Sequence, residues 1–165
     1  MVLGLSIDAF TTLHVVISLV AIAAGLVVLY GMIKGRRMVM LTGVFLATTV
    51  ATTVTGFMFP ISVLTPALIT GIVSSVLLLA ALVALYGRKL AGFWRGTYVV
   101  TAVAALYLNV FVLVVQSFLK LPALNALAPN GNEPPFLVAQ GAVLIAFLAL
   151  GYLAFRRFRP VLAAA

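Results

Sequence analysis

The sequence has few of the residues on which enzyme chemistry depends. It contains no cysteine, one histidine and two acidic residues, Asp8 and Glu133. Without cysteine the chain cannot form a disulfide, a thiolate nucleophile or a thiolate metal site. It also lacks a cluster of metal-ligating side chains and a paired acid and base within its apolar segments. We therefore expect a protein that is not an enzyme and has no catalytic residue, metal or cofactor.

Charge is scarce as well, and this sets the class of protein. Only 7% of the residues are charged, 65% are hydrophobic, and the mean hydropathy is +1.34. A soluble domain of this size would have to expose much of that apolar surface to water, so we predict an integral membrane protein. The net charge of +8 does not indicate a nucleic-acid partner, because the basic residues lie in short clusters at the ends of apolar runs. The expected partners are membrane lipids, a second copy of the chain or another membrane protein.

Long apolar runs predict an all-α bundle of transmembrane helices in a single domain, residues 1–165. A span needs about 20 residues to cross a hydrocarbon core. Five runs are long enough, at about residues 10–33, 38–59, 66–86, 98–120 and 136–155. Ser6 or Asp8 is expected to cap the first helix, and Thr65 the third. The long connection before the last span is expected to hold a short surface helix and a turn at Asn130-Gly131.

Basic residues predict the orientation of the bundle. If the spans alternate, nine of the ten Lys and Arg residues lie on one side, and the tenth, Lys120, lies on the other. The positive-inside rule then places the N-terminus outside and the C-terminus in the cytoplasm. Five aromatic residues fall at the same cytoplasmic ends and are expected to form an interfacial belt: Tyr30, Tyr86, Trp94, Tyr98 and Tyr152.

Polar residues inside the spans mark the candidate site. Most fall in the outer halves, Asn109 falls near the middle of the membrane, and the inner halves are almost purely aliphatic. A carboxamide in hydrocarbon is unfavourable without a hydrogen-bond partner, so these side chains should face protein. They either line a shallow pocket that opens to the outside or act as ties between helices. The candidates are His14, Thr52, Thr55, Thr70, Asn109, Gln116 and Gln140.

Two further patterns concern how the helices pack. The many threonines of the second span are expected to donate their hydroxyls to backbone carbonyls one turn earlier, which makes them tolerable in lipid. The small residues Ala21 and Gly25, on the same stripe as His14, should allow another helix to come close, and so should Gly71 and Ser75.

Several segments resemble a group of small bacterial inner-membrane proteins described as hypothetical transmembrane proteins. They are TLHVVISLVAIAAGLVVLYG, FLATTVATTVTGFMFP and YLNVFVLVVQSFLKLPALNALAP, together with EPPF. The resemblance covers nearly the whole chain. It implies a location in the bacterial inner membrane, and it brings no activity, substrate or catalytic residue.

Three functions remain open at this stage. The first, which we favour, is a non-enzymatic interaction or accessory membrane protein. The second is the binding or transport of a small solute through the outward-facing polar pocket. The third is a membrane redox subunit that uses haem or quinone, although a single histidine cannot supply both ligands of a b-type haem within one chain.

Overall fold

The structure, a computed structural model, describes residues 1–60 and 66–159 and is helical along most of this length. Five of its helices are long and apolar enough to cross a membrane. This confirms an all-helical chain with five helices of spanning length. The elements in chain order are α1 (Ile7–Ile33), α2 (Val39–Phe57), α3 (Pro66–Leu82), the π-helical turn η1 (Val83–Gly87), α4 (Trp94–Lys120), the short α5 (Pro122–Asn125) and α6 (Pro134–Arg157).

Helix ends differ from the predicted spans mainly where helices continue beyond the apolar window. Helix α4 begins at Trp94, a full turn before the predicted start at residue 98. Hydropathy marks only the apolar part of a helix. The helix itself can begin wherever the backbone becomes helical, and for α4 this is just after Gly92, whose φ of +55° is not helical. At the start of α1, the Ala9 N–H donates to the Ser6 hydroxyl at 3.2 Å, so Ser6 is the cap. Thr65 lies outside the described residues.

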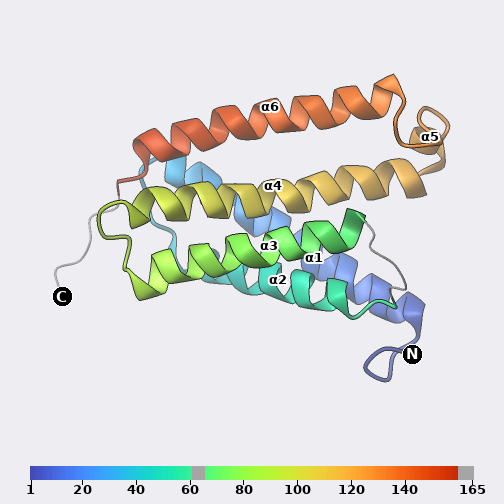
Figure 1. The fold of residues 1–165 in the computed structure, drawn as a ribbon, viewed down its shortest axis with the longest axis horizontal. Coiled ribbons are helices and arrows are strands. Elements are labelled where there is room, and N and C mark those ends of the chain that lie inside the picture. The colour runs from blue at the N-terminus through green and yellow to red at the C-terminus, as the bar shows by residue number, and fades with distance from the viewer. Residues whose placement is uncertain (61–65, 160–165) are drawn as a thin grey trace.

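The five long helices alternate in direction and lie side by side (Figure 1). Helix α1 packs against α2, α4 and α6, and α4 packs against α1, α3 and α6. All five long helices contribute to the hydrophobic core, and within it α1, α2 and α4 meet at Gly25. A Cβ atom added to Gly25 would lie 2.5 Å from Cδ1 of Leu106 and 2.8 Å from Cε2 of Phe45. The absence of a side chain at Gly25 therefore lets two other helices reach α1, as the stripe of small residues predicts.

Four threonines of α2 satisfy their hydroxyls within the helix. The side chains of Thr48, Thr49, Thr53 and Thr55 each donate to the carbonyl of the residue four positions earlier, at 2.7 to 2.9 Å. The predicted back-bonding is confirmed for these four residues, whereas the Thr52 hydroxyl has no hydrogen-bond partner among the described residues. The four bonded hydroxyls therefore present little unmet polarity to an apolar environment.

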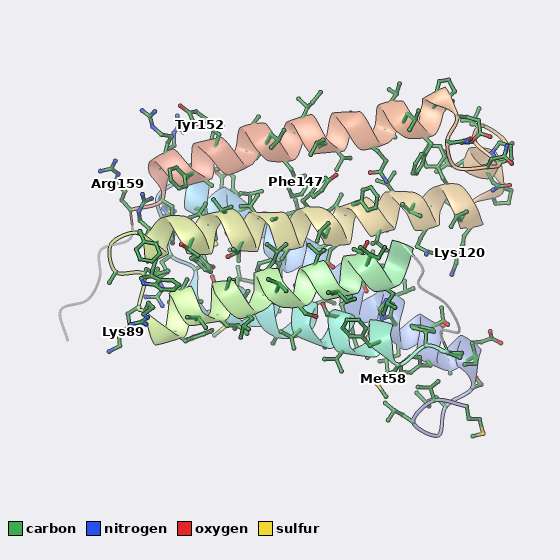
Figure 2. The ribbon with its side chains drawn as sticks, viewed as in Figure 1. Met58, Lys89, Lys120, Phe147, Tyr152 and Arg159 are labelled. Atoms are coloured by element: carbon green, nitrogen blue, oxygen red, sulfur yellow. The ribbon has the colours of Figure 1, made fainter. Side chains whose placement is uncertain are left out.

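One end of the bundle, which we call the basic end, carries nine of the ten cationic residues. Lys89 and Arg159 lie there, whereas Lys120 and Met58 lie at the opposite end, which we call the far end (Figure 2). The basic end is closed by Leu90 and Phe158, which are buried. Alternating helices thus gather the cations as the charge pattern predicts.

A single arginine ties the last turn of α6 to the bundle at the basic end. Nη1 of Arg95, at the start of α4, donates to the carbonyl oxygens of Phe155 at 2.9 Å and Phe158 at 2.7 Å. The last carbonyls of a helix have no partner within the helix, so a cation is well placed there.

The connection between α4 and α6 is folded around a carboxylate at the far end. Oε1 of Glu133 accepts from the backbone N–H and the side-chain amide of Asn130, and Oε2 accepts from the backbone N–H of Asn132. Gly131, with φ +72°, allows the reversal. The predicted short helix and the turn at Asn130-Gly131 are both present. Desolvation raises the pKa of Glu133, but these hydrogen bonds outweigh it, so the net shift is downward.

Candidate functional site

The candidate polar residues lie in the half of the bundle nearer the far end. Counted from the basic end of each helix at a rise of 1.5 Å per residue, with η1 counted as the end of α3, they lie between about 20 Å, for Thr52, and about 33 Å, for Gln116. They thus share one half of the bundle, and their depth in a membrane stays a prediction. The candidates differ in how they are used.

His14 and Thr55 are in direct contact and join α1 to α2. Nδ1 of His14 lies 2.7 Å from the hydroxyl oxygen of Thr55. The Thr55 hydroxyl proton is already donated to the Ala51 carbonyl at 2.7 Å. We therefore assign the proton between His14 and Thr55 to Nδ1, so the imidazole donates and, when neutral, its Nε2 is an acceptor. The ring stands edge-on to Phe59, with 5.3 Å between centroids.

Gln140 joins α6 to α4. Its side-chain amide nitrogen donates to the backbone carbonyl of Phe111 at 3.1 Å, and the residue is buried, with 9% of its surface exposed. Its side-chain oxygen, also buried, has no hydrogen-bond partner among the described residues. The amide nitrogen of Gln140 is therefore hydrogen-bonded across the two helices, and its amide oxygen is not hydrogen-bonded to any described residue.

Two more buried polar atoms are unpaired within the described part of the chain: Oγ1 of Thr52 and Nδ2 of Asn109. Thr52 lies on α2 and Asn109 on α4, at about 20 Å and about 22 Å from the basic end by helix rise. Helices α2 and α4 are in contact. Buried polar groups are usually paired, and an unpaired one costs about 1–3 kcal/mol. These atoms are therefore the positions at which a water molecule or a polar guest would gain most.

Gln116 and Thr70 occupy more open positions. Thr70 is half-buried on α3. Gln116 is exposed, although it shares a stripe of α4 with the buried residues Tyr98 and Ala102. Helix α4 continues past the start of α3 at the far end (Figure 1), so the stripe emerges from the bundle there. Gln116 thus faces the surroundings.

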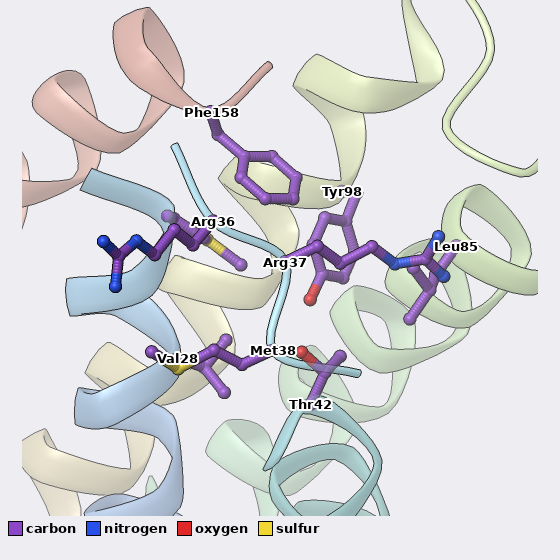
Figure 3. A pocket seen from close by; sticks show the side chains of 9 residues that line it. Val28, Arg36, Arg37, Met38, Thr42, Leu85, Tyr98 and Phe158 are labelled. Atoms are coloured by element: carbon purple, nitrogen blue, oxygen red, sulfur yellow. The ribbon is translucent and has the colours of Figure 1, made fainter. Parts of the chain in front are cut away.

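A small cavity at the basic end is lined by residues that are not among the candidate polar residues. It has a volume of about 10 Å³, which is about the space that one water molecule needs. Tyr98 and Thr42 line it, both are buried, and their hydroxyls point toward one another and are hydrogen-bonded (Figure 3). The guanidinium groups of Arg36 and Arg37 point away from this pair to opposite sides (Figure 3).

The burial of Tyr98 corrects its place in the predicted aromatic belt. Only 1% of its surface is exposed, whereas Tyr30, Tyr86 and Tyr152 are more than half exposed at the basic end. Tyr98 is buried because it continues the stripe of Ala102 and Ala105, whose small side chains face the core. That stripe is the sequence pattern from which the burial of Tyr98 could have been predicted. A buried tyrosine hydroxyl needs a hydrogen-bond partner, and Thr42 supplies one.

The structure therefore joins some of the candidates and separates others. Hydrogen bonds link His14 to Thr55, and the Thr55 hydroxyl lies 3.1 Å from the Thr52 carbonyl oxygen. Gln140 is bonded to backbone on a different helix pair, and Gln116 is exposed. Comparison of the chain with protein-family models, curated proteins and solved structures gives no match.

Proposed function

We propose that the protein is a multi-pass protein of the bacterial cytoplasmic membrane that acts through interaction with itself or with another membrane protein, without catalysing a reaction. Its apolar architecture of five spanning-length helices is consistent with an integral membrane protein. The observation that carries the proposal is the use made of its polar side chains. His14 and Gln140 each bridge one pair of helices.

These bridges favour a structural use of the polar side chains. In a catalytic or transport site, polar groups converge on a common space that a substrate can enter. Here the imidazole of His14 is bound between α1 and α2, and the amide of Gln140 is bound between α6 and α4. Such ties between membrane helices contribute about 0.6 kcal/mol each, and up to about 1.7 kcal/mol. They stabilise the bundle and leave its lateral faces as the surfaces for partners.

Introduced cysteines test the interaction, because the native chain has none. Single cysteines are placed at exposed positions on different faces of the bundle and oxidised in native membranes. We expect crosslinked products from positions on one face and none from the opposite face. The absence of a product from every face would overturn the interaction of the chain with itself. Suitable exposed positions are Val16→Cys, Val54→Cys, Val76→Cys, Val100→Cys and Ile145→Cys.

The proposed orientation has the N-terminus outside and the C-terminus in the cytoplasm. Nine of the ten cations lie at the basic end, which supports this orientation through the positive-inside rule. Alkaline phosphatase fused at the N-terminus should be active, and green fluorescent protein fused at the C-terminus should fluoresce. Two termini reported on the same side would refute it.

The unpaired buried atoms favour a second candidate function, the binding or transport of a small polar solute from the far end. Oγ1 of Thr52, Nδ2 of Asn109 and Oε1 of Gln140 are buried without partners in the described part of the chain. The variants Thr52→Val and Asn109→Leu separate the two functions. If the atoms only pack, removing an unpaired polar group should leave stability unchanged or raise it. If they hold a guest, both variants should lower the stability of the protein purified from its native membrane.

A further inference from the structure

A groove on the lateral surface of the basic end lies between the first turns of α4 and the last turn of α6. Its volume is about 480 Å³, and it is open along one side. Phe93, Val100 and Phe155 form most of its apolar wall, with exposed fractions of 72%, 56% and 41%. Gly96 lies beneath Phe155, since a Cβ atom there would lie 2.8 Å from the Phe155 ring. The groove is therefore a lipid-facing hollow with an aromatic rim.

The polar side chains along this groove do not interrupt its apolar wall. Thr97 and Thr101 line it, and their hydroxyls donate to the carbonyls of Phe93 at 3.3 Å and Thr97 at 2.7 Å. With the hydroxyls satisfied inside the helix, threonine presents chiefly its methyl group to a ligand. The part of the groove that runs from Gly96 toward Thr101 thus suits an acyl chain.

Arg95 supplies a fixed cation at the end of the groove. Its Nη1 donates to the Phe155 and Phe158 carbonyls, and its guanidinium lies 5.5 Å from the centroid of the Phe155 ring. A guanidinium has five N–H donors. Those on Nε and Nη2 have no hydrogen-bond partner within residues 1–60 and 66–159. A held guanidinium with free donors matches the paired oxygens of a phosphate.

Within residues 1–60 and 66–159, the surroundings of Arg95 add positive potential and no counter-charge. Both acidic residues of the chain, Asp8 and Glu133, lie at the far end, whereas nine of the ten cations lie at the basic end. Helix α4 starts beside the groove with no side-chain cap and no acidic residue in its first turn. Among the described residues, no acidic side chain therefore compensates the positive end of its dipole.

We propose that this groove binds one anionic phospholipid, with its phosphate on Arg95 and one acyl chain along Val100 and Thr101. Charge complementarity selects the headgroup, and the apolar wall selects a lipid over a free phosphate. The proposal rests on the membrane location given above and is independent of whether the protein acts by interaction. It goes beyond general attraction of cations to a membrane surface, because it assigns one lipid to one groove.

The single tryptophan of the chain, Trp94, provides the test. Its ring lies 4.7 Å, centroid to centroid, from Phe93 on the groove rim. The full-length protein is placed in phosphatidylcholine nanodiscs that contain a small fraction of brominated phosphatidylglycerol or, separately, of brominated phosphatidylcholine. We expect at least twofold stronger quenching of Trp94 by the anionic lipid at equal mole fraction. Free phosphate should not relieve the quenching by competition.

A matched pair of variants separates groove binding from a general surface effect. Val100→Phe fills the groove and should remove the preference for the brominated anionic lipid. Val76→Phe, on the exposed face of α3, should keep it. Equal quenching of the native protein by the two lipids, or an unchanged preference in Val100→Phe, would overturn the proposal. Weak quenching by both lipids would instead count against the membrane location itself.

Discussion

Replacing Gly25 by alanine should destabilise the bundle, because Gly25 lies where three helices meet. The added methyl group would lie 2.5 Å from Cδ1 of Leu106 on α4 and 2.8 Å from Cε2 of Phe45 on α2. Those two side chains are only 1% and 2% exposed, so neither has free space into which it can move. The helices must separate or the side chains must leave their preferred rotamers.

The size of the effect follows from comparison with a second glycine. Overpacking a well-filled core by one methyl group costs about 1–3 kcal/mol. Alanine also favours a helix over glycine by about 1 kcal/mol, which partly hides that cost. At Gly43, on α2, an added Cβ would meet no atom within 4 Å, so Gly43→Ala should show only the stabilisation from the higher helix propensity of alanine. The difference between the two variants, about 1–3 kcal/mol, therefore isolates the clash.

Reversible unfolding in mixed micelles of a mild detergent and dodecyl sulfate measures this difference. Helical circular dichroism and Trp94 fluorescence report the transition, and Gly141→Ala on α6, also without a neighbour within 4 Å, is a second control. We expect Gly25→Ala to unfold at a lower fraction of dodecyl sulfate than either control. If the three variants unfold together, α1, α2 and α4 do not meet at Gly25.

Three other predictions follow from individual contacts. In a double-mutant cycle, His14→Ala and Thr55→Val should show a coupling of about 0.6 kcal/mol, up to about 1.7 kcal/mol, and zero coupling would contradict the observed bond. Tyr98→Phe should lower the free energy of unfolding by about 1 kcal/mol, because Thr42 loses a buried partner, and the same loss should be absent in a Thr42→Val background. The pKa of Glu133 is lowered in the fold, so its contribution is complete above the unfolded pKa and is lost as pH falls through the lower folded value. Hydrogen exchange at the amide of Asn130, corrected for intrinsic rate, should therefore accelerate at acidic pH in the native protein but show no such step in Glu133→Gln.

Hydropathy and capping rules predicted the helices because they depend on local sequence. The Ser6 cap and the threonine back-bonds of α2 involve residues three or four positions apart. The start of α4 was missed for a different reason. A stretch that includes Trp94 and Arg95 has too low a mean hydropathy to be counted as an apolar span. A helix can nevertheless extend through such residues, because its backbone hydrogen bonds do not depend on the hydropathy of the side chains. Hydropathy locates the hydrocarbon part of a helix and not its ends.

The pairing of site residues could not be predicted from local pattern. The sequence places His14 and Thr55 at similar depth, but their bond spans 41 residues of chain and depends on how α1 and α2 are rotated against each other. Likewise, Gln140 meets α4 through a backbone carbonyl, and a carbonyl has no signature in the sequence. Burial of Tyr98 was predictable in principle from its stripe, but an aromatic residue near a helix end also suits an interface.

The bundle has two polar asymmetries, and they have different physical origins. In the proposed membrane orientation, Lys and Arg lie at helix ends because an ion is costly in hydrocarbon, and they collect at the basic end because of the positive-inside bias during insertion. The unpaired amide nitrogen of Asn109 and the bonded imidazole of His14 lie within the spans because a neutral polar group costs only a few kcal/mol there, which hydrogen bonds can offset. Substitutions in the cationic clusters, apart from Arg95 with its bonds to the end of α6, should therefore change orientation with little effect on packing. Substitutions among the amides and hydroxyls should change stability while the orientation stays fixed.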